Sequence, residues 1–126
     1  MKSFIIAIIL LLVVVATLIT TDLFLANSTD RNSRDLQEVY DAVEREDWDA
    51  ATELIHKAHE NWDEDNFLYS ILIDHLELDN IELRYLPATE FIEQHVKGDS
   101  LAECSNIIFL MNHLHDKTTF CLENIL

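Results

Sequence analysis

The first part of the chain is uniformly apolar, whereas the remainder places apolar residues at helical intervals among polar ones. The run FIIAIILLLVVVATLI extends from Phe4 to Ile19, and only Thr17 interrupts it. A bilayer core of about 30 Å needs about 20 apolar helical residues. The stretch that ends at Thr21 is slightly shorter, which local thinning of the bilayer can accommodate. The pattern therefore predicts a transmembrane signal anchor over residues 1–21.

A cleaved signal peptide is the alternative interpretation of the apolar run. Its charged region would be Met1 to Ser3, but the apolar run is at or beyond the usual length of about 7–15 residues. The small residues Ala26-Asn27-Ser28 do not form a clear cleavage site. We favour the anchor. Lys2 is the only charged side chain before the run, and cations favour the cytoplasmic side. We therefore expect a single-pass protein of the cell membrane with an extracytoplasmic C-terminal domain.

Beyond the anchor, residues 22–33 are predicted to form a polar linker and residues 34–126 an acidic helical domain. A first amphipathic helix is expected over about residues 34–45, with Ser33 as its N-cap. A second helix follows Asp47, a residue type that caps helices well. Its apolar residues recur every three or four positions, which is the pattern of a buried helical seam. These residues are Trp48, Ala51, Ile55, Ala58 and Trp62. The two Trp rings are expected to cover the ends of the core.

The acidic stretch 63–66 is expected to connect the second helix to a long third helix that starts near Phe67. Apolar residues surround most of this third helix, which predicts a central position with neighbours on several sides. Pro87 is expected to kink or break it, because proline lacks the amide donor and disfavours helical geometry in the preceding residue. Gly98 is the expected residue just past its C-terminus.

A fourth helix is expected to begin at Ser100 or Asp99, and a short final helix or turn covers 118–126. Cys104 and Cys121 would then lie on neighbouring helices. An oxidising exterior permits a disulfide between them, and two buried thiols are the alternative. We favour the thiols.

The composition narrows the class of fold and of function. Gly98 and Pro87 are the only glycine and proline, so hairpins and glycine-rich phosphate loops are disfavoured. We predict an all-α protein in which the anchor helix precedes a small antiparallel bundle of four to five helices. The chain has 24 acidic and 8 basic residues and a formal charge of −16. Only Asp22 and Lys2 of these lie before residue 27, so the domain is strongly acidic and a nucleic-acid partner is disfavoured.

His75 and Asp79, four residues apart on the expected central helix, are the most interesting polar pair. They could form a buried acid–base or metal-ligating pair, or a structural hydrogen bond between helices; we favour the structural role. The Glu-x-x-His pattern of Glu53 and His56 occurs in di-iron bundles, but it has no second copy and lies off the apolar seam. We therefore predict no catalytic residue, no specific metal site and no cofactor.

Several short motifs resemble the bacterial domain-of-unknown-function 4363 family. They are EDWDAA at 46–51, Trp62, IDHLELDNI at 73–81 and LENIL at 122–126. The resemblance covers nearly the whole chain. It implies a single-pass helical protein without an assigned activity, and a partner among YetF-like integral membrane proteins. The family-like positions, which we take as structural or binding residues, are Trp48, Trp62, His75, Asp79 and Asn124.

These observations together predict a non-enzymatic, membrane-anchored extracytoplasmic accessory or interaction protein that partners an integral membrane protein. The alternative is an extracytoplasmic sensor that binds a metal or another cation through His75, Asp79 and the acidic surface. An enzyme that uses His75 as a base is the least favoured hypothesis, because no nucleophile or substrate-orienting loop is evident.

Overall fold

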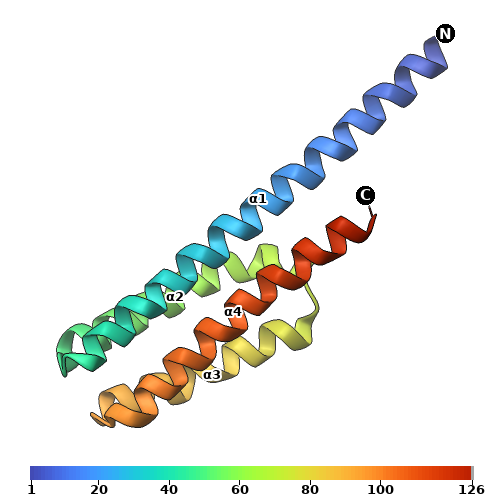
Figure 1. Cartoon of the computed structure of the whole chain (residues 1–126). Helices are drawn as coiled ribbons and strands as arrows, with labels where there is room; N and C mark the ends of the chain where they lie inside the picture. Colours follow the sequence, from blue (N-terminus) through green and yellow to red (C-terminus); the bar gives the residue numbers. More distant parts are fainter. Residues whose placement is uncertain (126) are drawn as a thin grey trace.

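A computed structural model describes the backbone of residues 1–125 and the side chains of residues 1–114 and 116. This part of the chain consists of four helices and contains no strand (Figure 1). The helices are α1 (Lys2–Glu44), α2 (Trp48–Leu72), α3 (His75–Glu93) and α4 (Lys97–Ile125). The predicted all-α class is therefore confirmed.

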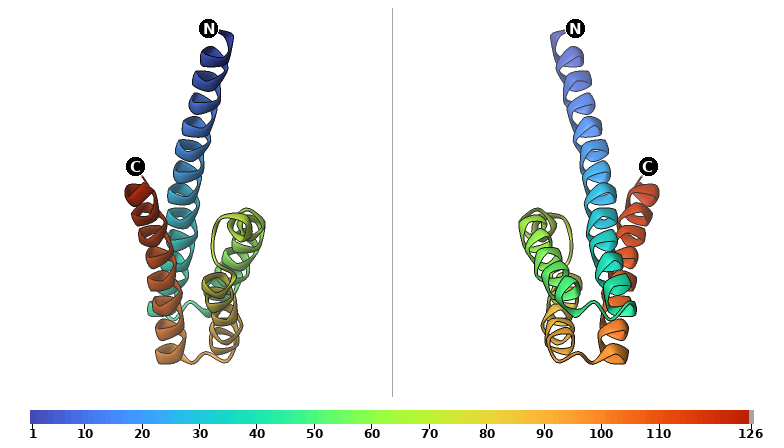
Figure 2. Two further views of the ribbon diagram at one scale, coloured as in Figure 1. Left: turned by 90° about the vertical axis from the view of Figure 1, so that its right-hand side faces the viewer. Right: turned by 90° about the vertical axis from the view of Figure 1, so that its left-hand side faces the viewer.

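The helices form an antiparallel four-helix bundle whose consecutive members are neighbours. α1 packs against α2 and α4, and α3 packs against the same two helices. The N-terminal half of α1 projects from the bundle without a neighbour over most of its length (Figures 1 and 2). An apolar N-terminal helix followed by a helical bundle is thus confirmed, and the C-terminal half of α1 is itself one of the four bundle helices.

The core lies between the four helices and draws on each of them. Leu36, Val39 and Val43 come from α1, and Ile81, Tyr85 and Ile92 come from α3. Of the seam predicted on α2, four residues are buried, namely Ala51, Ile55, Ala58 and Trp62. Trp48 packs against the edge of the same core, and its ring stacks on His95 with centroids 4.9 Å apart. The helical period of α2 therefore predicted its buried face correctly.

The polar linker predicted for 22–33 is wrong, because α1 runs through it without interruption. The hydroxyl groups of Ser28 and Thr29 donate to the carbonyls of Phe24 and Leu25 at 2.7 and 2.6 Å. Asn32 donates to the Ser28 carbonyl at 2.9 Å and is fully buried. These side-chain donors, which favour loops when exposed, instead form hydrogen bonds inside the helix and the bundle. Ser33 lies inside α1 and is not its N-cap.

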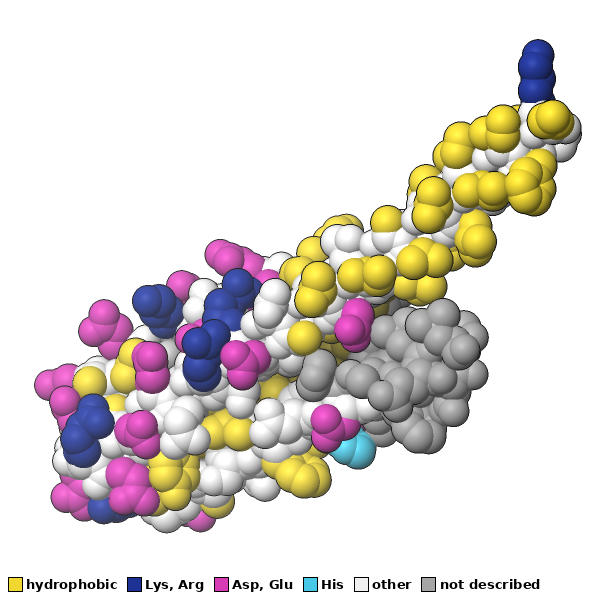
Figure 3. Space-filling model, turned by 45° about the horizontal axis from the view of Figure 1, so that its top comes forward, with side chains coloured by type: hydrophobic (Ala, Val, Ile, Leu, Met, Phe, Trp, Pro, Cys, Tyr) yellow, Lys and Arg dark blue, Asp and Glu magenta, His cyan; other side chains and the backbone are white. Residues whose placement is uncertain are grey.

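The projecting half of α1 is long and apolar enough to cross a membrane. Its most apolar window has a mean hydropathy of 3.0, and none of that window is buried. Figure 3 shows hydrophobic side chains along the visible face of this part of the helix. The hydroxyl groups of Thr17 and Thr20 donate to the carbonyls of Val13 and Ala16, each at 2.8 Å. These polar groups are satisfied within the helix, as hydrocarbon surroundings require.

Two of the three turns use residues other than glycine at a position that glycine usually occupies. Glu46 and His95 have φ angles of 57° and 59°, in the left-handed region. After Glu46 the Asp47 amide donates to the Ala42 carbonyl at 3.0 Å, and the same arrangement recurs after His95. These are Schellman-type helix ends. The prediction for Gly98 is wrong, because Gly98 lies in the first turn of α4.

Asp47 caps α2 as predicted, because its carboxylate accepts from the Ala50 amide at 3.3 Å. The connection predicted at 63–66 is wrong, since these residues continue α2. The chain instead leaves the helix at Ile73, and the Asp74 carboxylate caps α3 by accepting from the Leu76 amide at 3.0 Å. The helix break therefore falls about ten residues later than the acidic run suggested.

The prediction of a long central third helix that starts near Phe67 is also wrong. Phe67 belongs to α2, and α3 begins at His75. Pro87 does not break α3, which continues to Glu93. The carbonyl that Pro87 leaves without a donor belongs to Leu83, which is exposed and can be hydrated. The apolar residues around this segment do not indicate a central helix; many of them face outwards.

α4 is a single helix from Lys97 to Ile125, so neither the cap predicted at Ser100 or Asp99 nor a separate final helix is observed. Cys104 and Cys121 therefore lie on the same helix rather than on neighbouring ones. Seventeen helical residues span about 25 Å, and a disulfide requires Cα atoms within about 7 Å. The alternative of an internal disulfide is excluded, and Cys104 is a buried free thiol.

Candidate functional site

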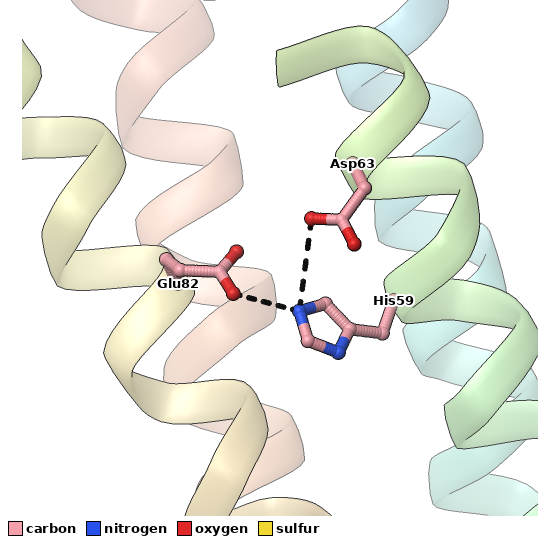
Figure 4. A group of neighbouring side chains, drawn as sticks. All are labelled: His59, Asp63 and Glu82. Carbon is pink, nitrogen blue, oxygen red and sulfur yellow. Dashed lines mark hydrogen bonds and ion pairs between the residues drawn. The ribbon is translucent and has the colours of Figure 1, made fainter.

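The strongest cluster of chemically active side chains joins α2 to α3. His59 and Asp63 lie one turn apart on α2, and Glu82 faces them from α3 (Figure 4). His59 Nε2 is 2.8 Å from Glu82 Oε1 and 3.8 Å from Asp63 Oδ1. One ligand atom from each of these residues lies within 4.8 Å of the others. A single imidazole nitrogen therefore points at two carboxylates from different helices.

Two buried aromatic residues hold this cluster in place. The indole Nε1 of Trp62 donates to Glu82 Oε2 at 2.9 Å. The ring of Tyr85 stacks on His59 with centroids 4.5 Å apart and planes only 9° from parallel. Glu82 is thus oriented by a neighbour that leaves its other oxygen free for His59. Outer hydrogen bonds of this kind orient metal ligands in proteins.

The cluster can hold either a proton or a cation. A carboxylate only accepts hydrogen bonds. The contact between His59 and Glu82 therefore requires a hydrogen atom on His59 Nε2, which donates the hydrogen bond to Glu82 Oε1. If a divalent cation replaces that proton, one imidazole and two carboxylates become its ligands. Zn²⁺ and Mn²⁺ accept such a mixed nitrogen and oxygen set. His59, Asp63 and Glu82 remain partly exposed, so water can supply the remaining ligands.

A second polar network is buried between α1 and α2. The carboxylate of Asp65 accepts from the Arg31 guanidinium and from Asn32 Nδ2, the latter at 2.8 Å. The hydroxyl group of Tyr69 donates to Ser28 Oγ at 2.7 Å and lies 3.3 Å from Asn32 Nδ2. The hydrogen bond to Asp65 raises the pKa of Arg31, and burial raises the pKa of Tyr69. The network ties α1 to α2 where α1 enters the bundle, and we assign it a structural role.

Burial also raises the pKa values of two side chains in the core, Tyr85 and Cys104. The pKa of Tyr85 lies well above its usual value, chiefly because its hydroxyl group is buried. That hydroxyl group has no hydrogen-bond partner among the described residues. Burial raises the pKa of the Cys104 thiol to about 12. Neither group is suited to chemistry near neutral pH, because the phenol and the thiol both stay protonated.

A patch of exposed apolar side chains surrounds the turn between α2 and α3. We call it the apolar tip; its members are Phe67, Leu68, Ile71, Leu72 and Leu76. Phe67, Ile71 and Leu76 are 72%, 67% and 71% exposed. Three of its members, Leu68, Ile71 and Leu72, line a groove against α1 together with Thr20, Thr21 and Phe24. The tip thus adjoins the end of the projecting helix.

The structure distributes the five predicted site residues over different surroundings. Trp62 is fully buried and orients Glu82, whereas Trp48 covers one end of the core. His75 and Asp79 are exposed at the start of α3. The hypothesis that they form a buried pair on a central helix is therefore wrong. The side chain of Asn124 lies outside the described residues. These five residues therefore do not converge on one site.

The sequence analysis missed the pairing of His59 with Glu82. The spacing of His59 and Asp63 is visible in the sequence, but it resembles many exposed pairs on acidic helices. Glu82 is 23 residues further on, and only the packing of α3 on α2 brings it to the imidazole. Glu53 and His56 are exposed as expected, and His56 Nε2 lies 3.4 Å from Glu93.

Comparison with known proteins gives a family but no activity. No curated protein and no solved structure matches the chain. Residues 19–125 match the family model described as "Domain of unknown function (DUF4363)". The match starts near the end of the apolar run and covers all four helices of the bundle. The resemblance noted in the sequence is therefore confirmed, and the chain belongs to the DUF4363 family.

Proposed function

We propose that this protein is a membrane-anchored accessory protein whose acidic helical bundle lies outside the cell membrane and associates with an integral membrane protein. The observation that carries the proposal is the continuity of α1 from Lys2 to Glu44. One helix provides both the apolar segment and a bundle helix, with no flexible linker between them. A bundle attached in this way keeps a constant height and tilt above the bilayer.

The orientation follows from the charges on either side of the apolar run. Lys2 precedes it, and the strongly acidic bundle follows it. Cations favour the cytoplasmic flank, which places the bundle on the opposite side. Inside the bilayer, the apolar half of α1 exposes its whole circumference, so it is available to pack against another membrane helix. The family resemblance favours a YetF-like protein as that partner.

Isolation of the full-length protein in mild detergent tests the proposal. With an affinity tag after Leu126, we expect one integral membrane protein to co-purify in constant stoichiometry. A control keeps the bundle but replaces residues 4–19 with an unrelated apolar helix, and it is expected to lose that partner. Repeated recovery of the chain alone argues against the accessory role. Digestion by external protease in intact cells tests the orientation, and resistance of the bundle contradicts it.

A second candidate function is divalent-cation binding, which is supported by the convergence of His59, Asp63 and Glu82. This cluster replaces His75 and Asp79 as the centre of the sensor hypothesis. Binding would bridge α2 and α3 and would displace the proton between His59 and Glu82. The high negative charge of the bundle raises the local concentration of cations.

Titration calorimetry of the full-length protein with Zn²⁺, Mn²⁺ and Ca²⁺ tests this candidate. We expect one equivalent to bind the wild type, and the His59→Ala variant to lose that heat. His56→Ala is the matched control, because His56 is an exposed histidine on the same helix that also pairs with a glutamate of α3. Absence of heat at micromolar concentrations, or equal losses in both variants, rules out the His59 site.

A further inference from the structure

The apolar tip is too exposed to be part of the bundle core. The helices that carry it already bury another face, through Tyr69 on α2 and Leu78 on α3. Phe67, Ile71 and Leu76 point away from that face and remain about two-thirds exposed or more. Contiguous exposed apolar residues of this kind mark a surface that contacts another apolar phase or partner.

The position of the tip along α1 indicates what covers it. The groove that it shares with α1 has a volume of about 340 Å³ and is lined by Thr20, Thr21 and Phe24 on the α1 side. Phe24 also contacts the Tyr69 ring, with centroids 6.1 Å apart. In Figure 2 the turn between α2 and α3 lies beside α1 at the level where the projecting helix leaves the bundle.

The thickness of a bilayer places its boundary at this same level. A core of about 30 Å corresponds to about 20 helical residues at 1.5 Å per residue. Counted from Phe4, the first residue of the apolar run, these residues end near Leu23, between Thr21 and Phe24. The outer edge of the hydrocarbon therefore meets α1 beside Leu68, Ile71 and Leu72.

We propose that the apolar tip inserts into the outer interface of the same bilayer that α1 crosses, and so gives the bundle a second attachment to the membrane. This inference rests on the membrane anchoring proposed above. Interfacial helices bury their apolar faces about 5–10 Å into the boundary between headgroups and acyl chains. Contact at α1 and at the tip together stops the bundle from rotating about the axis of α1, so the same faces always point at neighbouring membrane proteins.

The charges around the tip define how it contacts lipid. Between Asn66 and Asn80 the sequence contains three acidic residues, Asp74, Glu77 and Asp79, one histidine, His75, and no lysine or arginine. Attraction to anionic headgroups therefore contributes nothing. Insertion depends on apolar burial, and it is expected to be equally strong in phosphatidylcholine and at high salt.

Depth-dependent fluorescence quenching tests the proposal on the full-length chain. Three variants, Ile9→Cys, Ile71→Cys and Leu86→Cys, carry an environment-sensitive fluorophore in a Cys121→Ser background. Cys104 is buried with a raised pKa and stays unlabelled. Ile71 and Leu86 are matched in exposure, at 67% and 66%, but Leu86 lies ten residues beyond Leu76 along α3, about 15 Å further from the tip.

Each variant is reconstituted in phosphatidylcholine vesicles that contain acyl-chain spin-labelled lipid. We expect the probes at Ile9 and Ile71 to shift to the blue and to lose most of their emission, while the probe at Leu86 stays unquenched at every salt concentration. A water-exposed probe at Ile71 beside a quenched probe at Ile9 overturns the tip insertion and leaves the anchor intact. An unquenched probe at Ile9 overturns both proposals. If the probe at Ile71 is shielded from water in native membranes but not in pure lipid, a protein covers the tip. That result also overturns the proposal that the tip contacts lipid.

Discussion

The buried network between α1 and α2 makes a quantitative prediction about Asp65→Ala. Asp65 is only 8% exposed, and it accepts hydrogen bonds from Arg31 and from the fully buried amide of Asn32. Its truncation leaves Asn32 with its remaining contacts to the Ser28 carbonyl and the Tyr69 hydroxyl group. The side chain of Arg31 is about half exposed, so water can solvate its guanidinium group after the substitution.

The individual contributions can be weighed against one another. Loss of the charge-assisted bond from Asn32 costs about 1.5–3 kcal/mol. The ion pair with Arg31 contributes less than about 1 kcal/mol, because its guanidinium is solvated. The higher helix propensity of alanine returns about 0.6 kcal/mol. We therefore expect Asp65→Ala to lower the free energy of unfolding by roughly 1–3 kcal/mol, which corresponds to a decrease in Tm of roughly 4–24 °C.

Asp63→Ala is the control, because it makes the same substitution two residues away on α2. Asp63 is 61% exposed, and its Oδ1 lies 3.8 Å from His59 Nε2. The propensity gain is the same in both variants, so their difference isolates the buried network. Guanidinium unfolding in detergent micelles, followed by the fluorescence of the buried Trp62, measures both values, with EDTA present to keep the His59 cluster free of metal. Equal stabilities within about 0.5 kcal/mol would refute the assigned role of Asp65.

Three further predictions concern the core and the thiols. Trp62→Ala should cost about 3–5 kcal/mol of unfolding free energy and Trp48→Ala about 1–2, because only Trp62 is fully buried; equal losses in denaturant titrations contradict this. Tyr85→Phe should be neutral or stabilising, because it removes a buried hydroxyl group without a described partner. Since burial holds the pKa of Tyr85 above that of the unfolded phenol, the wild type should lose stability as the pH rises past about 10, and the variant less so; identical pH profiles contradict this. Peptide mapping should find no bond between Cys104 and Cys121 and no alkylation of Cys104 at pH 8 before unfolding, because α4 separates them and burial keeps the thiol protonated.

The ends of the helices show where local sequence patterns mislead. Residues 22–33 and 63–66 contain the Asn, Ser and Asp that favour turns, yet both stretches are helical. The packing of α1 on α2 joins one polar side chain from each stretch, because Asn32 donates to Asp65. Two of the three turns, at Glu46 and His95, lack the glycine that usually marks a helix end. Turn propensity is a local preference, and tertiary partners can override it.

The amino-acid sequence by itself determined the apolar helix at the N-terminus, the all-α class and the buried seam of α2, because each depends on the character and spacing of residues within one segment. The cap at Asp47 was predictable for the same reason. Only the tertiary structure decided which residues meet across helices, such as His59 with Glu82 and Asn32 with Asp65. It also decided that the apolar residues around Ile71 face outwards beside α1. Periodicity shows that a helix has an apolar face, but the packing of its neighbours decides whether that face is covered.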